Sequence, residues 1–186
     1  MGALAGPILI CGYAAPKEWK GLPGLNDSKQ LGEDLKRKLR RQLWHLVTKR
    51  EAYCRVEFWS HADIDRMGIA NAHRLAIRNV IIDLVARLKH ALVVDVIVDG
   101  NLNFSGIHPK VRSVVKADTK FPTVSAASVI AKVHRDEHMP SLDDDGLYGF
   151  KENMGYPTPK HKEALSKHGP GPYHRQSYTP VREAMR

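Results

Sequence analysis

The hydrophobic positions of this chain follow two periods, which predict alternating strands and helices. Short apolar runs predict strands at residues 7–14, 53–59, 91–98 and 111–115. Apolar residues three or four apart predict helices at about 27–50, 71–88, 122–139 and 159–167, and Ser60 is placed to cap a short helical turn through Ile64. This order of strands and helices indicates an α/β fold with a mixed sheet flanked by helices.

The first predicted helix has two contrasting faces. Asp27 or Ser28 is expected to cap its start. One face carries five leucines, namely Leu31, Leu35, Leu39, Leu43 and Leu46. The opposite face carries five cations, namely Lys36, Arg37, Lys38, Arg40 and Arg41. We therefore expect the leucine face to be buried and the basic face to lie outward.

Length and composition fit one soluble domain. The chain has 186 residues, 42% of them hydrophobic, so we expect a single domain over residues 1–186, in which residues from about 148 form a C-terminal extension of loops and one helix. No apolar run reaches the roughly 20 residues of a membrane span, and the N-terminus lacks a signal-peptide pattern. Cys11 and Cys54 are expected to be buried free thiols in a reducing cytoplasm.

The chain is basic. Lys and Arg number 29 against 20 Asp and Glu, which gives a formal net charge of +9. Such an excess favours an anionic partner, most often nucleic acid. A generally basic surface without a nucleic-acid partner explains the same count equally well.

Two aspartates stand at the ends of apolar runs. Asp99 follows the run 93–98 and precedes Gly100, and Asp118 follows the shorter run 114–117. Ligands of open α/β sheets bind beyond the carboxyl ends of strands, and Mg²⁺ or Mn²⁺ prefers carboxylate oxygens. The pair therefore predicts a divalent-metal site. The alternative is that both are turn residues, because Asp followed by Gly is common in turns.

The predicted helix 122–139 carries a polar face beside this pair. Ser125, Ser128, Lys132 and Arg135 recur at helical spacing on one side, whereas small and branched apolar residues occupy the other. Hydroxyls and cations next to a carboxylate-held metal suit a phosphodiester substrate. Ordinary amphipathicity gives the same pattern.

Two further segments are candidates for contacts to nucleic acid. The sequence Gly-Tyr-Pro-Thr at 155–158 holds Tyr156 in a constrained turn, where its ring can stack on a base or pack on the domain edge. His161, His168, His174 and Arg175 add hydrogen-bond donors nearby. Lys29 follows Asn-Asp-Ser at a predicted helix start, where it can hold a phosphate, although a plain helix cap explains the segment equally well.

These segments together resemble one family. Leu-Asn-Asp-Ser-Lys at 25–29, Val-Asp-Gly at 98–100, Lys-Ala-Asp at 116–118, Ser-Ala-Ala-Ser at 125–128 with Ala-Lys-Val-His-Arg-Asp at 131–136, Tyr-Gly-Phe at 148–150, Gly-Tyr-Pro-Thr at 155–158 and His-Arg at 174–175 occur in that order. The sequence resembles ribonuclease HII, the type 2 ribonuclease H, from Gly2 to about Val181. An ordered set of motifs is far more specific than any one of them.

The resemblance implies a ribonuclease H-like fold and a monomeric, cytoplasmic endonuclease. It implies cleavage of RNA in RNA–DNA hybrids and at single ribonucleotides embedded in duplex DNA. It also implies Mg²⁺ or Mn²⁺ held by acidic residues, among them Asp99 and Asp118. By the same resemblance Tyr156 stacks at the ribonucleotide–deoxyribonucleotide junction, Gly2 matches a glycine of a substrate-reading loop, and Lys29, Ser128 and Lys132 are phosphate contacts.

The family pattern includes an N-terminal strand that ends in Asp-Glu and is followed by Gly-Arg-Gly. Gly2 matches the second of those glycines, and Met1 stands at the arginine position. From this difference we expect little or no nuclease activity from the printed chain, since two carboxylates supply a charge of −2 against the +4 of two divalent ions. The alternatives are a hybrid-binding relative without cleavage activity and a basic RNA-binding structural protein.

Overall fold

The structure is a computed structural model and describes residues 2–26, 28, 30–88, 95–104, 106–143 and 145–185. The chain divides into two compact units. The first unit comprises Met1–Leu9, Phe58–His73 and His134–Arg186, and the second comprises Ile10–Glu57 and Arg74–Val133. The predicted α/β class is confirmed. The assignment of all 186 residues to one domain stays a prediction.

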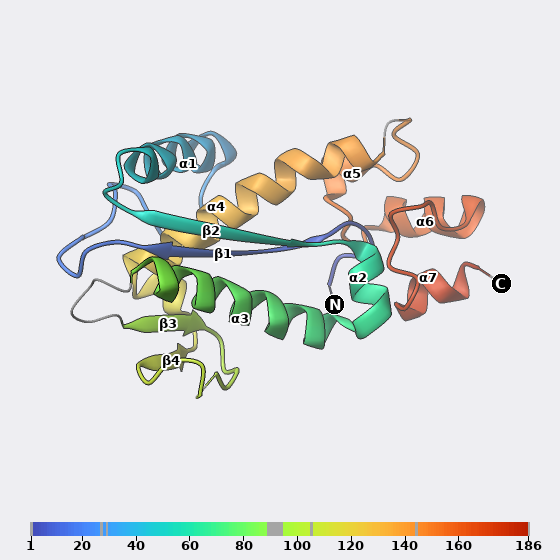
Figure 1. Ribbon diagram of the computed structural model, residues 1–186. Coiled ribbons are helices and arrows are strands. Elements are labelled where there is room, and N and C mark those ends of the chain that lie inside the picture. Colours follow the sequence, from blue (N-terminus) through green and yellow to red (C-terminus); the bar gives the residue numbers. More distant parts are fainter. Residues whose placement is uncertain are drawn as a thin grey trace. The chain divides into compact units, whose positions relative to one another are not determined.

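The strands of the described residues pair as two small sheets (Figure 1). β1 (Ile8–Ala14) pairs with β2 (Tyr53–Trp59), and β3 (Val96–Asp99) runs parallel to β4 (Val111–Val114). The predictions at 7–14, 53–59 and 111–115 are confirmed to within one residue. Of the strand predicted at 91–98, residues 91–94 lie outside the described residues.

Most helices begin and end close to their predicted positions. The helices are α1 (Glu33–Thr48), α2 (His61–Met67), α3 (Ile69–Arg87), α4 (Pro122–His138), α5 (Phe150–Asn153), α6 (Pro159–His168) and α7 (Thr179–Glu183), with 3₁₀ turns η1 (Ala117–Thr119) and η2 (Met139–Leu142). Ser60 caps α2 as predicted, because its hydroxyl accepts a hydrogen bond from the Asp63 N–H at 3.1 Å. Across the described ranges, no helix is long and apolar enough to cross a membrane.

The predicted start of α1 is wrong. The helix begins at Glu33, after Gly32, and not at residue 27 or 28. Ser28 is buried, and its hydroxyl oxygen lies 2.8 Å from that of Ser128 in α4. Local sequence predicts that the Ser28 hydroxyl caps the helix, but it instead bonds to Ser128, 100 residues away. Asp27 lies outside the described residues.

The core of the second unit is aliphatic and lies where α1 meets α4. Leu39 and Leu43 of α1 are fully buried, whereas Leu35 at the edge of the leucine face is 38% exposed. Leu39 and Leu43 form a cluster with the apolar face of α4, namely Ala126, Ala127, Val129, Ile130 and Val133. The predicted leucine face is thus confirmed at its centre.

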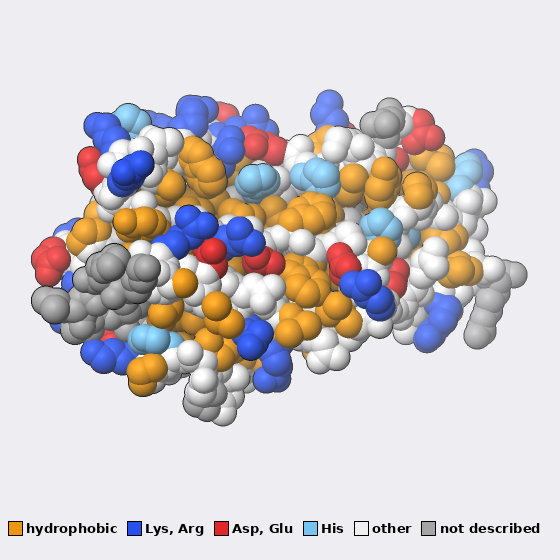
Figure 2. Space-filling model, viewed as in Figure 1, with side chains coloured by type: hydrophobic (Ala, Val, Ile, Leu, Met, Phe, Trp, Pro, Cys, Tyr) orange, Lys and Arg blue, Asp and Glu red, His pale blue; other side chains and the backbone are white. Residues whose placement is uncertain are grey.

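The basic face of α1 is confirmed only in part. Arg37, Lys38 and Arg41 are exposed, and Figure 2 shows Lys and Arg side chains gathered over this helix. Lys36 is an exception, since it is only 8% exposed. Its ammonium nitrogen lies 3.0 Å from the Glu33 carboxylate, which pairs the charge while the aliphatic stem is covered.

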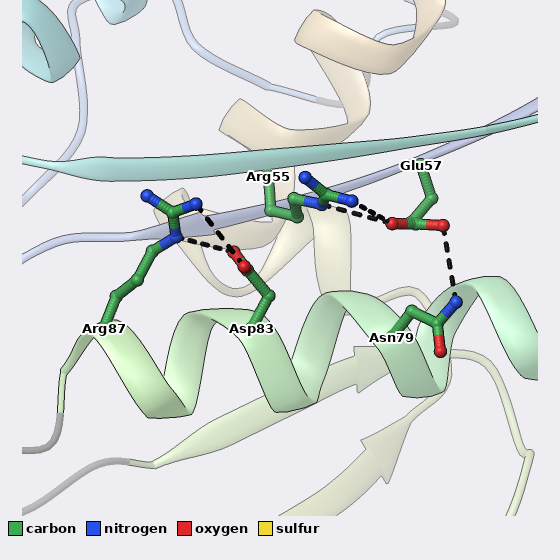
Figure 3. Close-up of polar contacts among 5 residues, drawn as sticks. All are labelled: Arg55, Glu57, Asn79, Asp83 and Arg87. Carbon is green, nitrogen blue, oxygen red and sulfur yellow. Dashed lines mark hydrogen bonds and ion pairs between the residues drawn. The ribbon is translucent and has the colours of Figure 1, made fainter.

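Close packing against β1 fixes α3. A side chain at Gly12 would lie 2.6 Å from the Leu84 side chain and would also overlap Val80, so only glycine allows this approach. Figure 3 shows the polar contacts beside this packing. Glu57 of β2 accepts hydrogen bonds from the Arg55 guanidinium and from the Asn79 side-chain amide of α3.

Two free thiols face each other on β1 and β2. The sulfur atoms of Cys11 and Cys54 lie 3.5 Å apart, and both residues are partly buried. The hydrogen bond between the two thiols lowers the pKa of Cys54, and the same bond together with burial raises the pKa of Cys11.

Candidate functional site

Asp99 lies at the carboxyl end of two parallel strands in the second unit. It is the last residue of β3 and pairs in register with Val114, the last residue of β4. Gly100 extends the ladder, because its N–H donates to the Val114 carbonyl at 3.0 Å. Val98 is buried and Asp99 is exposed, so the carboxylate emerges from the strand end as predicted.

Asp118 occupies a different kind of position from the predicted one. It lies in the 3₁₀ turn η1, four residues after β4 ends, and not at a strand end. The turn follows Lys116, whose φ of 56° puts it in the left-handed region. This reversal ends the extended chain earlier than the apolar run 114–117 suggests. Asp118 is only 9% exposed.

One hydrogen bond connects the two positions. The Asp99 carboxylate oxygen Oδ1 accepts from the Ala117 N–H at 2.8 Å, and Ala117 is the residue before Asp118. The bond therefore brings the Asp99 carboxylate to the turn that carries Asp118, across 18 residues of sequence. That the two carboxylates share one metal ion stays a prediction.

The serines on the polar face of α4 bond to other parts of the protein, although the sequence predicted a face open to substrate. Ser125 is buried, and its hydroxyl donates to the Asn26 carbonyl at 2.7 Å. Ser128 contacts Ser28. These bonds attach Asn26 and Ser28 to α4. Lys132 lies one turn further along the helix and is partly exposed. The predicted phosphate contact Lys29 lies outside the described residues.

The first unit holds Tyr156 in a tight turn. Gly155 has a φ of +77°, and a side chain there would lie 2.7 Å from the Ala5 carbonyl oxygen. The Tyr156 N–H donates to the Asn153 carbonyl at 2.8 Å. The ring stays 45% exposed, and the Arg135 guanidinium carbon lies 5.5 Å from its centroid.

The N-terminal segment contacts this turn. The Leu4 N–H donates to the Gly155 carbonyl at 2.7 Å, two residues from the exposed Gly2. The first unit thus brings Gly2 and Tyr156 to one region, as the second unit brings together Asp99 and the Asp118 turn. The roles of these residues in binding or catalysis stay predictions.

Two arginines bind the main chain of the N-terminal segment, and sequence patterns did not indicate this. Arg175, only 3% exposed, donates to the carbonyls of Gly6 at 3.0 Å and Pro7 at 3.2 Å. Arg135 donates to Pro7 at 3.1 Å and to Met154 at 2.9 Å, and burial lowers the pKa of its guanidinium. Arg135 therefore serves the first unit rather than a phosphate-facing stripe on α4. The one sequence feature that could have indicated the role of Arg175 is its place in the His-Arg motif at 174–175.

The donor set at the end of β3 suits a hard cation. Asp99 and Asp118 offer carboxylate oxygens, which Mg²⁺ and Mn²⁺ prefer. Among the described residues, no group of three or more His, Cys, Asp or Glu side chains lies together in a way that would hold a metal ion.

Comparison with known proteins identifies the family. The family model for ribonuclease HII matches residues 1–181. A ribonuclease HII from Magnetococcus marinus is 38% identical over 99% of this chain and 83% of its own length. One from Oceanobacillus iheyensis is 33% identical over 97% of this chain, which spans 65% of that protein.

A solved structure shows the same fold. The crystal structure of Bst-RNase HIII in complex with Mn²⁺ superposes with a TM-score of 0.78, over 100% of this chain and 66% of that one, at 18% identity. The ribonuclease H-like fold expected from the sequence is thereby confirmed. On the family match and these relatives, the chain belongs to the ribonuclease HII family, whose members are hydrolases of the ribonuclease H type.

Proposed function

We propose that the protein cleaves the RNA strand of RNA–DNA hybrids, and duplex DNA at embedded ribonucleotides, by metal-assisted phosphodiester hydrolysis. The observation that carries the proposal is the hydrogen bond from the Ala117 N–H to Asp99, which brings the Asp99 carboxylate to the turn that carries Asp118, beyond the end of a parallel strand pair. Family membership supports it, and so does the fold shared with a manganese-bound ribonuclease HIII.

Asp99 and Asp118 would hold Mg²⁺ or Mn²⁺. Such an ion, when bound, supplies activation of the attacking water and stabilisation of the leaving oxygen. Asp99 is fixed by the Ala117 N–H through one carboxylate oxygen, which leaves its other oxygen to face a ligand. The buried position of Asp118 restricts its side chain and so pre-organises the pair.

The remaining predicted residues would contact the substrate. Lys132 and Ser128 on α4, together with Lys29, are proposed to contact phosphates, to which a net charge of +9 adds a general attraction. Gly2 and the exposed Tyr156 ring are proposed to read the ribonucleotide junction. We also propose that the protein acts as a monomer in the cytoplasm, where thiols such as Cys11 and Cys54 stay reduced.

The test is cleavage of a duplex with one embedded ribonucleotide in Mg²⁺ and in Mn²⁺, with the full natural polypeptide. Asp99→Asn and Asp118→Asn should each lower the cleavage rate by about 100-fold or more, because each removes charge from the cation site. Asp95→Asn is the matched control, since Asp95 is exposed just before the same strand. Native rates in both site variants would refute the proposal.

A second candidate is a protein that binds hybrids without cutting them. It is favoured by the small ligand set, since the proposed metal site has two carboxylates and, within the described ranges, no third acidic, His or Cys ligand beside them. Fluorescence anisotropy with a labelled RNA–DNA hybrid separates the two. Tight, salt-dependent binding with no cleavage in either metal would favour this candidate.

A further inference from the structure

Two buried histidines in the first unit form a continuous hydrogen-bonded path to the Tyr156 main chain. His161, near the start of α6, is fully buried, and His174 is 1% exposed. Their Nε2 atoms lie 3.0 Å apart. His161 Nδ1 lies 2.9 Å from the Tyr156 carbonyl oxygen.

The direction of this path follows from its far end. His174 Nδ1 lies 3.0 Å from the Gly171 N–H nitrogen and 3.3 Å from the Gly171 carbonyl oxygen. The shorter contact has the N–H as donor, so we assign no proton to that nitrogen. A neutral His174 then carries its proton on Nε2 and donates to His161 Nε2. His161 in turn carries its proton on Nδ1 and donates to the Tyr156 carbonyl. The main chain at 171 thereby fixes the tautomers of both rings and the donor offered to Tyr156.

The surroundings enclose both rings and favour their neutral forms. Tyr148 lies against His174 with a centroid separation of 4.5 Å, and Phe150 lies against His161 at 5.3 Å. Burial lowers the pKa of His161, and burial together with the neighbouring His161 lowers the pKa of His174 to about 4. Because both buried rings are hydrogen-bonded, holding them in one orientation costs little free energy.

We propose that His161 and His174 are positioning residues, which hold the Tyr156 carbonyl and so orient the exposed Tyr156 ring toward a nucleic-acid base. The proposal rests on the substrate role of Tyr156 proposed above. The main chain also holds the turn, because the Thr158 N–H donates to the same Tyr156 carbonyl at 2.8 Å, Gly155 receives the Leu4 N–H, and Tyr156 donates to Asn153. His161 adds a side-chain donor to this carbonyl and so connects the turn to the interior of the first unit.

The first test measures the histidine tautomers and the contact of the Tyr156 ring, and it needs no substrate. Nitrogen-15 NMR of the full chain at pH 7 should show His161 protonated on Nδ1 and His174 on Nε2. A nuclear Overhauser effect between the Tyr156 ring and the Arg135 side chain, which lie in contact, should be present in the native protein. His161→Leu should abolish it, and His161→Asn should retain it because its amide can replace the Nδ1 donor.

The control is His168→Leu, a change at the exposed last residue of the same helix, which should leave the tautomers and the ring contact unchanged. The opposite tautomers, or an unchanged Tyr156–Arg135 contact in His161→Leu, would overturn the positioning role. Neither outcome depends on whether the protein is a nuclease.

The second test connects the path to the substrate. We compare the dissociation constants of a duplex with one embedded ribonucleotide and of an all-DNA duplex. His161→Leu should reduce this discrimination about tenfold, within the range of one stacked base. In a Tyr156→Ala background the same change should have no further effect, since the two residues would act as one unit.

An equal loss in both backgrounds would mean that His161 acts on the fold in general, and the positioning proposal would fail. Failure of the proposed function gives a different result, namely native binding that does not distinguish the two duplexes while the NMR signature is intact.

Discussion

The two compact units are stabilised in different ways. In the second unit, aliphatic side chains from α1 and α4 fill the interior, and cations lie mostly outside. The first unit has smaller apolar clusters, and its buried arginine and histidine side chains also bond to the main chain. Arg175 and Arg135 hold Gly6 and Pro7, and the histidine pair reaches the Tyr156 turn.

This difference bears on function. An aliphatic core tolerates exchange of side chains of similar volume, because its contacts have no direction. Buried hydrogen bonds are directional, and each lost partner leaves a costly unsatisfied group. The first unit is therefore suited to hold a glycine loop and an aromatic ring in fixed orientations, whereas the second provides a rigid base for two carboxylates.

The largest effect on stability is expected for the buried guanidinium. Arg175→Met should lower the free energy of unfolding by about 4 kcal/mol, because the carbonyls of Gly6 and Pro7 lose charge-assisted donors. Urea unfolding followed by circular dichroism measures the loss. Arg182→Met, at an exposed position on α7, is the control and should change little. Equal midpoints for the two variants would contradict a polar framework in the first unit.

A cavity in the second unit should cost somewhat less. Leu43→Ala removes a fully buried side chain between α1 and α4 and should lower the free energy of unfolding by about 3 kcal/mol. Leu35→Ala on the same helix is the control, since Leu35 is 38% exposed and its truncation creates little cavity. Urea unfolding measures both variants. Equal losses in the free energy of unfolding at Leu43 and Leu35 would mean that the core does not lie between α1 and α4.

The sequence predicted the second unit better than the first for a physical reason. Periodicity reports which face of an element is apolar, and the buried faces of α1 and α4 follow it. Lys36, placed on the outer basic face, is buried against Glu33 because its long stem can be covered while the charge stays paired.

The first unit depends on partners that no local pattern shows. A histidine or arginine in a loop looks the same whether it is solvated or bonded to a carbonyl 169 positions away, as Arg175 is to Gly6. The motif match could place Tyr156 in a turn, but not the path through His161 and His174. In the second unit, the early start predicted for α1 was wrong for the same reason, because Ser28 bonds to the distant Ser128.

Acid should weaken the first unit through His174. Its folded pKa of about 4 lies below the ordinary 6.5, so the unfolded chain binds the proton more readily and stability falls as pH falls. His174 alone should contribute a loss of about 2 kcal/mol between pH 7 and pH 5. Asp143 opposes this shift, and His61 and His161 add to it.

Urea midpoints at the two pH values measure the acid effect. His174→Gln should remove most of the difference that belongs to this group, and His168→Gln, at an exposed position, should retain it. An identical pH dependence in native protein and His174→Gln would show that the ring is not held neutral, and would contradict the direction assigned to the hydrogen-bonded path.

The smallest effect is expected for a charge pair in the second unit. Glu33→Gln removes the partner of Lys36 and Arg37 and should cost about 0.5 kcal/mol, because the Glu33 side chain is 44% exposed and solvent screens it. Asp34→Asn in the same turn is the control, since it changes the helix-end charge without touching Lys36. Both should converge with the native protein at high salt, measured as urea midpoints. A loss comparable to that of Arg175→Met would mean that Lys36 depends on Glu33 inside the core, and the second unit would then be polar in the same sense as the first.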